Sequence, residues 1–190
     1  MVINGKSILL RTSIGSDLEY YREWWSNLEL MRSFDQIPPM TYFEIEQEYK
    51  KNLASPNRLD FIIEDKSNKP LGTVFLKNIN WINRNAEQHI LIADPACQNL
   101  GFGIEAQYYI LKHAFHQLNM HKLYGRILEY ASGIIKSLEM VGYKKEAVCK
   151  NVAFHNGKYW DLFIYGLLSD EFTDFLNHDN AKYMEYAKTN

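Results

Sequence analysis

The chain has 190 residues, of which 46% are hydrophobic and 14% aromatic, and its formal net charge at pH 7 is −2. This length and apolar content predict a single domain with a substantial core. The charge does not supply the basic surface that a phosphate backbone requires, which argues against nucleic acid as the main partner.

The first half of the chain predicts one strand, two helices and a meander. A capping box at Ser16–Glu19 and apolar residues at helical spacing as far as Leu28 predict the first helix. A second capping box at Thr41–Glu44 begins a helix that runs to about Leu53. The predicted strands of this half span residues 7–11, 59–64, 71–81 and 86–93.

The second half predicts a helix over 101–118, a strand over 122–128 and a helix over 132–140 that Gly142 ends. A hairpin follows, with strands over 143–154 and 158–168. The order is β-α-α-β-β-β-α-β-α-β-β, which predicts a mixed α/β fold. We expect a central, mostly antiparallel sheet of about seven strands with helices on both faces. We expect residues 1–172 to form one domain and 173–190 a C-terminal helix or tail.

The two cysteines, Cys97 and Cys149, form no CxxC pair or Cys/His cluster, so no bound metal is predicted. We interpret them as reduced thiols. The N-terminus lacks the apolar run of a signal peptide, and no apolar stretch approaches the ~20 residues of a membrane span. These features predict a cytoplasmic protein without a membrane partner.

Residues 98–103, Gln-Asn-Leu-Gly-Phe-Gly, are the most informative stretch of the sequence. Two glycines let the backbone turn tightly and approach a ligand closely. The first amides of the helix that follows have no partner inside the helix and carry partial positive charge. No carboxylate occurs between Ala96 and Ile104. The stretch therefore predicts a binding site for a pyrophosphate.

This loop has three other interpretations. It is not a P-loop, because no Lys-Ser/Thr pair follows Gly103. It does fit the dinucleotide fingerprint Gly101-x-Gly103-x-x-Ala106, with Glu129 at the position of a ribose-binding acid. However, a meander strand and Asp94-Pro95 precede the loop, which disfavours a Rossmann unit and a nicotinamide-dependent oxidoreductase. An ordinary glycine-rich helix start remains the structural alternative.

Gln98-x-x-Gly101-x-Gly103 resembles the Q/R-x-x-G-x-G/A loop of the GNAT acetyltransferases, which binds the pyrophosphate of acetyl-CoA. Residues 137–143 (SLEMVGY) and 157–161 (GKYWD) resemble further runs of that family. Both runs are similar to the branch that contains ribosomal-protein N-terminal and spermidine acetyltransferases. The resemblance covers roughly residues 8–172 and implies the GNAT fold.

The sequence departs from the family at two positions. Ala131 stands where the family commonly has an Asn that contacts the pantetheine arm, and Ser132 is the candidate to replace that contact. Leu138 stands where other branches place a Tyr that protonates the leaving thiolate. These departures leave open whether CoA binding is weakened, and they favour the alternative of a non-catalytic acyl-CoA sensor or scaffold.

The resemblance implies acetyl-CoA as co-substrate and direct attack of an amine on its thioester. Backbone groups of residues 90–92 are expected to hold the pantetheine arm by β-augmentation. The backbone amides of residues 100–104 are expected to bind the pyrophosphate. The candidate cofactor-binding residues are Ile90, Leu91, Ile92, Gln98, Asn99, Leu100, Gly101, Phe102, Gly103, Ile104 and Ser132.

An alkyl amine has a pKa near 10, so only about one molecule in a thousand is neutral at pH 7, and a general base accelerates the reaction. Strand alternation separates Glu87 and His89 from Ala86, Gln88 and Ile90, which have the pattern of a core-facing set. Glu87, His89 and Glu129 are the candidate catalytic residues, although each is also consistent with a surface or ion-paired role. The acceptor stays open between a protein N-terminus, a polyamine, an amino sugar and another small amine, and a homodimer is possible.

Overall fold

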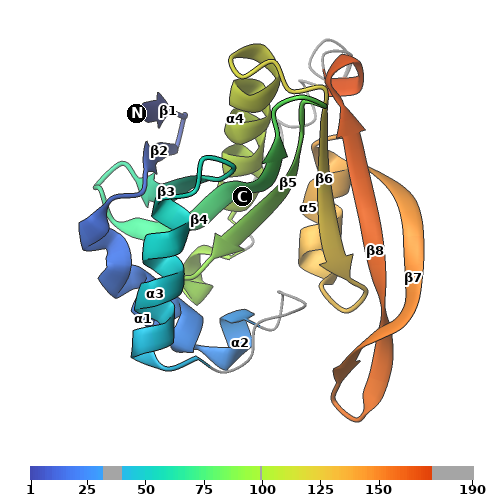
Figure 1. Cartoon of the computed structure of the whole chain (residues 1–190), viewed down its shortest axis with the longest axis horizontal. Coiled ribbons are helices and arrows are strands. Elements are labelled where there is room, and N and C mark those ends of the chain that lie inside the picture. Colours follow the sequence, from blue (N-terminus) through green and yellow to red (C-terminus); the bar gives the residue numbers. More distant parts are fainter. Residues whose placement is uncertain (32–39, 99, 173–190) are drawn as a thin grey trace.

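The computed structural model describes residues 1–31, 40–98 and 100–172, and its core element is an eight-stranded sheet in the order β1-β2-β3-β4-β5-β6-β8-β7 (Figure 1). All neighbouring strands are antiparallel except β5 and β6. The mixed α/β prediction is confirmed, with the short β1 as the strand that the sequence did not reveal. The strands are β1 (Val2–Asn4), β2 (Ile8–Thr12), β3 (Leu59–Asp65), β4 (Pro70–Asn80), β5 (Asn85–Ile92), β6 (Lys122–Leu128), β7 (Lys144–His155) and β8 (Lys158–Leu168).

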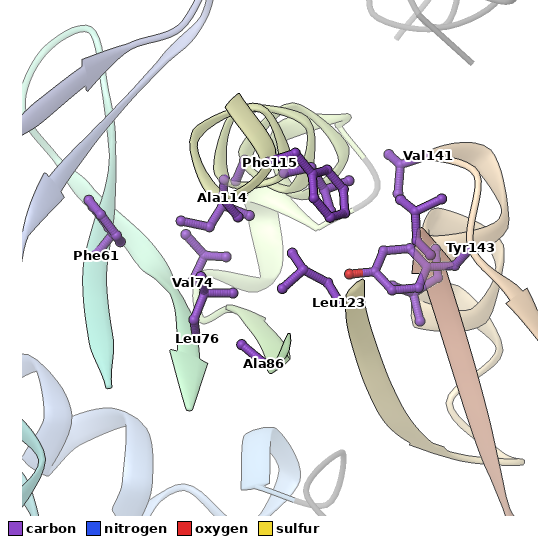
Figure 2. Close-up of a cluster of buried hydrophobic side chains, with 14 of the residues drawn as sticks. Phe61, Val74, Leu76, Ala86, Ala114, Phe115, Leu123, Val141 and Tyr143 are labelled. Atoms are coloured by element: carbon purple, nitrogen blue, oxygen red, sulfur yellow. The ribbon is translucent and has the colours of Figure 1, made fainter. Parts of the chain in front are cut away.

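Helices cover both faces of this sheet. Strand β3 shows the division, because Phe61 and Ile63 face one cluster while Ile62 faces the other. The first cluster packs the sheet against α4 (Phe102–His116) and α5 (Ser132–Met140), and Figure 2 shows Phe115 of α4 close to Leu123 of β6. The second packs it against α1 (Leu18–Ser26), α2 (Leu28–Met31) and α3 (Tyr42–Leu53).

Strands β5 and β6 separate partway along their length. Their parallel pairing joins Asn85–Glu87 to Lys122–Tyr124 and ends there, although β5 continues to Ile92 and β6 to Leu128. Figure 1 shows the two strands diverging below this junction, with α5 beside β6. The backbone of β5 from Gln88 onward is therefore an edge within the sheet, which a ligand with amide groups can pair with.

Two local predictions near the N-terminus are wrong. The Ser16–Glu19 capping box does not form, because a 3-10 turn (Gly15–Asp17) precedes α1 and the Asp17 carboxylate binds Arg11 and the amide of Ile14 instead. Leu28 is 55% exposed rather than part of the buried stripe. The side chain of Asn27 accepts from the amide of Glu29 at 3.0 Å, which begins α2 as a separate helix.

The second capping box is confirmed at the start of α3. Thr41 Oγ1 accepts from the amide of Glu44, and Glu44 accepts in turn from the amide of Thr41 at 2.7 Å. We expect Thr41→Ala to lower the free energy of unfolding by about 1 kcal/mol, because it leaves a helix amide without its acceptor. Urea unfolding measures the change. Thr41→Ser keeps the hydroxyl and is expected to stay close to wild type, and equal losses in the two variants would contradict the capping role.

Two predictions from the sequence concern residues outside the described part of the chain. The predicted C-terminal helix or tail over 173–190 and the candidate residue Asn99 lie outside the described residues. In the described part, no helix is long and apolar enough to cross a membrane.

Candidate active site

A pocket of about 340 Å³ opens where the end of β5, the start of α4 and one face of α5 meet. Its walls therefore come from elements on both sides of the point where β5 and β6 separate. The lining residues are Glu29, Leu30, Ile90, Leu91, Ile92, Gln98, Gly101, Gly103, Ile104, Gln107, Gly133, Ile134, Lys136, Ser137 and Met140.

Glycine shapes the helix start at the mouth of this pocket. Gly101 is the N-cap of α4 with φ 85° and ψ −12°, a left-handed conformation that side chains with a Cβ disfavour. A Cβ at Gly103 would lie 3.4 Å from Ile92 Cγ1. The amides of Phe102, Gly103 and Ile104 have no acceptor inside the helix, and within the described residues no side chain caps them. This arrangement can bind an anionic phosphate group.

The predicted cofactor-binding residues are only partly brought together. Seven of them line the pocket, namely Ile90, Leu91, Ile92, Gln98, Gly101, Gly103 and Ile104. Gln98 also ties the loop to the strand, because its Nε2 donates to the carbonyl of Ile92 at 3.1 Å. Leu100 is 46% exposed, Phe102 packs against the first core cluster, and Ser132 is exposed at the start of α5, so their side chains are not in the lining.

A smaller cavity of about 30 Å³ lies between the separating strands. Ile90 and Ile134 line both this gap cavity and the larger pocket. His89 and Arg126 line it on the other side, together with Gln88, Ile127 and Leu138. The gap cavity thus shares lining residues with the pocket and has His89 in its own lining.

Glu87 and His89 form a buried pair on that face. Glu87 is 3% exposed. Its carboxylate forms hydrogen bonds with His89 Nε2 at 2.7 Å and with Asn78 Nδ2, which donates at 3.0 Å. It also forms an ion pair with Lys77 Nζ at 3.5 Å. The His89 ring stacks on Phe75 with centroids 4.9 Å apart. The sequence alternative of two solvated surface residues is therefore wrong.

The pair is arranged so that the carboxylate is charged and the ring neutral. Burial alone would raise the pKa of Glu87, but the hydrogen bond and charge of His89, the charge of Lys77 and the hydrogen bond from Asn78 lower that pKa to about 2. Burial lowers the pKa of His89 below its usual 6.5, against the opposing effect of Glu87. Because an ionised carboxylate only accepts, the neutral ring carries its proton on Nε2, which leaves Nδ1 as the basic nitrogen.

The lowered pKa of Glu87 predicts a pH-dependent contribution to stability. The carboxylate stabilises the fold above its ordinary pKa of 4.5, and this contribution is lost as the pH falls from 4.5 towards 2. We expect Glu87→Gln to be less stable than wild type at pH 7 and to approach it below pH 4.5. Urea unfolding of both proteins at a series of pH values measures this, and a difference that does not change with pH would contradict it.

The third catalytic candidate, Glu129, makes its described hydrogen bonds with Asp161 and not with Glu87 or His89. Glu129 is exposed after the end of β6, and its Oε2 accepts from the amide of Asp161 at 3.3 Å. Leu138, at the position where relatives of other branches have a Tyr, is 4% exposed and part of the core. Within the described residues, no group of three or more His, Cys, Asp or Glu could hold a metal ion.

Sequence reasoning missed several lining residues, above all Gln88, Gln107, Lys136 and Ser137. The helical periodicity of α5 places Gly133, Lys136 and Met140 on one face, but only the packed structure shows that this face lines the pocket. Gln107 was the recoverable signal, because it and Glu105 are the two polar residues among the buried residues of α4.

Comparison with known proteins agrees with this fold. Residues 7–144 match the family model described as an acetyltransferase (GNAT) domain. A spermidine N(1)-acetyltransferase of Vibrio cholerae is 29% identical over 155 residues, covering 82% of this chain and 89% of that protein. A probable N-acetyltransferase of Bacillus subtilis is 25% identical and covers 90% of this chain and 98% of that protein. The crystal structure of the Vibrio cholerae spermidine N-acetyltransferase with CoA and spermine superposes with a TM-score of 0.82 at 27% identity, over 88% of this chain and 98% of that one.

The fold, with its separating strands and its open helix N-terminus, defines a class of acyl-CoA-dependent transferases. The chain belongs to the GNAT acetyltransferase family. It is an N-acetyltransferase that uses acetyl-CoA as co-substrate.

Proposed function

We propose that this enzyme acetylates a primary amine of a polyamine, with CoA held in the pocket between β5, α4 and α5. The observation that carries the proposal is that Ile90 and Ile134 line both the pocket and the gap cavity, because a thioester at the end of the CoA arm would then lie close to the Glu87–His89 pair. The acceptor class is drawn from the Vibrio cholerae relative, which is named for spermidine.

The pyrophosphate of CoA binds the amides of Phe102, Gly103 and Ile104 in this proposal, where the helix dipole adds to the attraction. Lys136 lines the same pocket and supplies a cation for the phosphates. The pantetheine arm then runs along the edge of β5 from Ile92 towards Gln88 and pairs with its backbone.

The acceptor amine approaches from the face that carries His89. A polyamine amine is protonated at neutral pH, so a base must take its proton before it can attack. We assign that role to His89, with Glu87 fixing the ring and stabilising the imidazolium that forms. Glu129 remains a weaker candidate, because its described contacts are with Asp161.

Two measurements test the proposal. Thermal shift with acetyl-CoA is expected to raise Tm, and release of free thiol is expected to accelerate when spermidine is added. Peptides with free N-termini, aminoglycosides and amino sugars are the comparison acceptors. Turnover of another amine but not of spermidine would overturn the acceptor class, whereas binding of CoA without turnover of any amine would favour a sensor. Failure to bind CoA would overturn the site itself.

A further inference from the structure

One buried glutamine lines the CoA pocket and another lines the adjoining gap cavity, and each has one amide atom without a partner in the described part of the chain. These atoms are Oε1 of Gln107 and Nε2 of Gln88. We propose that they hold the acyl-pantetheine arm, with Gln107 accepting a hydrogen bond from an amide N–H of the arm and Gln88 donating one to the thioester carbonyl. This inference rests on the proposed position of CoA.

Gln107 is fixed as an acceptor. It is fully buried, and its Nε2 donates to Ser137 Oγ at 2.8 Å. The Ser137 hydroxyl donates in turn to the carbonyl of Ile134 at 3.0 Å, so its proton is already used and it accepts from Gln107. The amide orientation is thereby set, and Oε1 is left as an acceptor in a residue that lines the larger pocket.

Gln88 is oriented so that its remaining amide group is a hydrogen-bond donor. Its Oε1 accepts from the hydroxyl of Tyr143 at 2.6 Å, and Tyr143 is itself 3% exposed in the first core cluster. Gln88 is 5% exposed and lines the gap cavity, and its Nε2 is a buried donor without a partner among the described residues. Buried polar atoms without partners are rare and unfavourable, and two of them in residues that line adjoining cavities indicate a ligand that supplies the missing groups.

The arm of acyl-CoA offers those groups in matching order. Its two amides carry N–H donors, and its far end carries the thioester carbonyl. Gln107 lies on α4 near the pyrophosphate end, whereas Gln88 lies in the gap, next in sequence to His89. The amine lone pair forms the C–N bond while the carbonyl π electrons move onto oxygen, where the Gln88 amide stabilises the charge. Collapse re-forms the carbonyl and breaks the C–S bond. The thiolate leaves and takes the second amine proton, because His89 already holds the proton removed before the attack.

The role of Gln107 is tested by the Gln107→Met variant with two ligands, CoA and adenosine 3′,5′-bisphosphate, which lacks the arm. We expect Kd for CoA to rise about tenfold and Kd for the bisphosphate to stay within about twofold of wild type. An unchanged Kd for CoA, or an equal rise for both ligands, would overturn the assignment. The matched control is Gln117→Met, at the exposed C-cap of the same helix.

The role of Gln88 is tested by Gln88→Met, which has nearly the same shape without the donor. We expect kcat to fall by about 100-fold, as for loss of one oxyanion donor, with Kd for CoA within about twofold of wild type. Gln88→Asn keeps a polar amide but withdraws it from the gap, and it covers the case in which Met does not fold. Retained kcat in either folded variant would overturn the assignment of Gln88 to the thioester carbonyl. Wild-type protein that fails to bind CoA would instead refute the proposed function.

Discussion

We expect His89→Gln to reduce kcat by about 10²–10⁴-fold at pH 7 while the protein remains folded. Gln can still donate to the Glu87 carboxylate, so the buried charge keeps a hydrogen-bond partner. What the variant loses is a nitrogen that can accept a proton. The effect is therefore expected on turnover, with little change in Kd for CoA or in Tm.

The pH dependence of turnover distinguishes the loss of a catalytic base from the loss of folded structure. Because the pKa of His89 lies below 6.5, the wild-type base is neutral at pH 7 and the rate is expected to level off near there. In the variant the rate should follow the fraction of neutral amine and rise about tenfold per pH unit towards pH 10. The gap between the two proteins then narrows in alkali. Parallel pH profiles would exclude His89 as the base.

A control variant separates this effect from the removal of any buried polar group. Glu105 is 4% exposed on α4 and accepts from the amide of Ser7 at 2.9 Å, and it does not line either cavity. Glu105→Gln keeps an acceptor at that position. We expect its kcat and pH profile to match wild type.

The second large effect is expected from Gly103→Val. Its Cβ would lie 3.4 Å from Ile92 Cγ1 and 3.7 Å from Ile90 Cδ1, and two further methyl groups would lie over the open amides of α4. Losing charge-assisted hydrogen bonds to the pyrophosphate costs about 3 kcal/mol, which corresponds to about a 100-fold rise in Kd for CoA.

Calorimetric titration with CoA measures this rise, and circular dichroism checks that α4 is retained. The control is Gly15→Ala, where an added Cβ has no heavy atom within 4 Å and the pocket is untouched. Gly103→Val that binds CoA as tightly as wild type would contradict the placement of the pyrophosphate.

The elements best predicted from sequence were those with local signals. The hairpin of β7 and β8 turns at Asn156-Gly157, with positive φ at both residues, as the sequence indicated. The conformation and the candidate role of the loop before α4 were also predictable from its glycines. Gly101 is the N-cap of α4 and adopts the left-handed conformation that glycine favours. The Thr41 cap of α3 is equally local.

The features that were missed depend on packing between distant segments. Nothing in β5 or β6 alone tells that their pairing ends at Glu87 and Tyr124, and this separation creates the gap cavity. The alternation of β5 identified Glu87 and His89 as one face. It could not show that this face is buried, because the cover comes from other elements, such as the ring of Phe75 on β4. The roles of the two glutamines depend on Tyr143 and Ser137, far away in sequence.

A crystal structure of the complex with CoA tests the central claim most directly. The account predicts pyrophosphate oxygens within about 2.7–3.2 Å of the amides of Phe102, Gly103 and Ile104, and the thiol end of the arm between β5 and β6. CoA bound elsewhere on the chain, with these helix amides in contact with solvent alone, would contradict it.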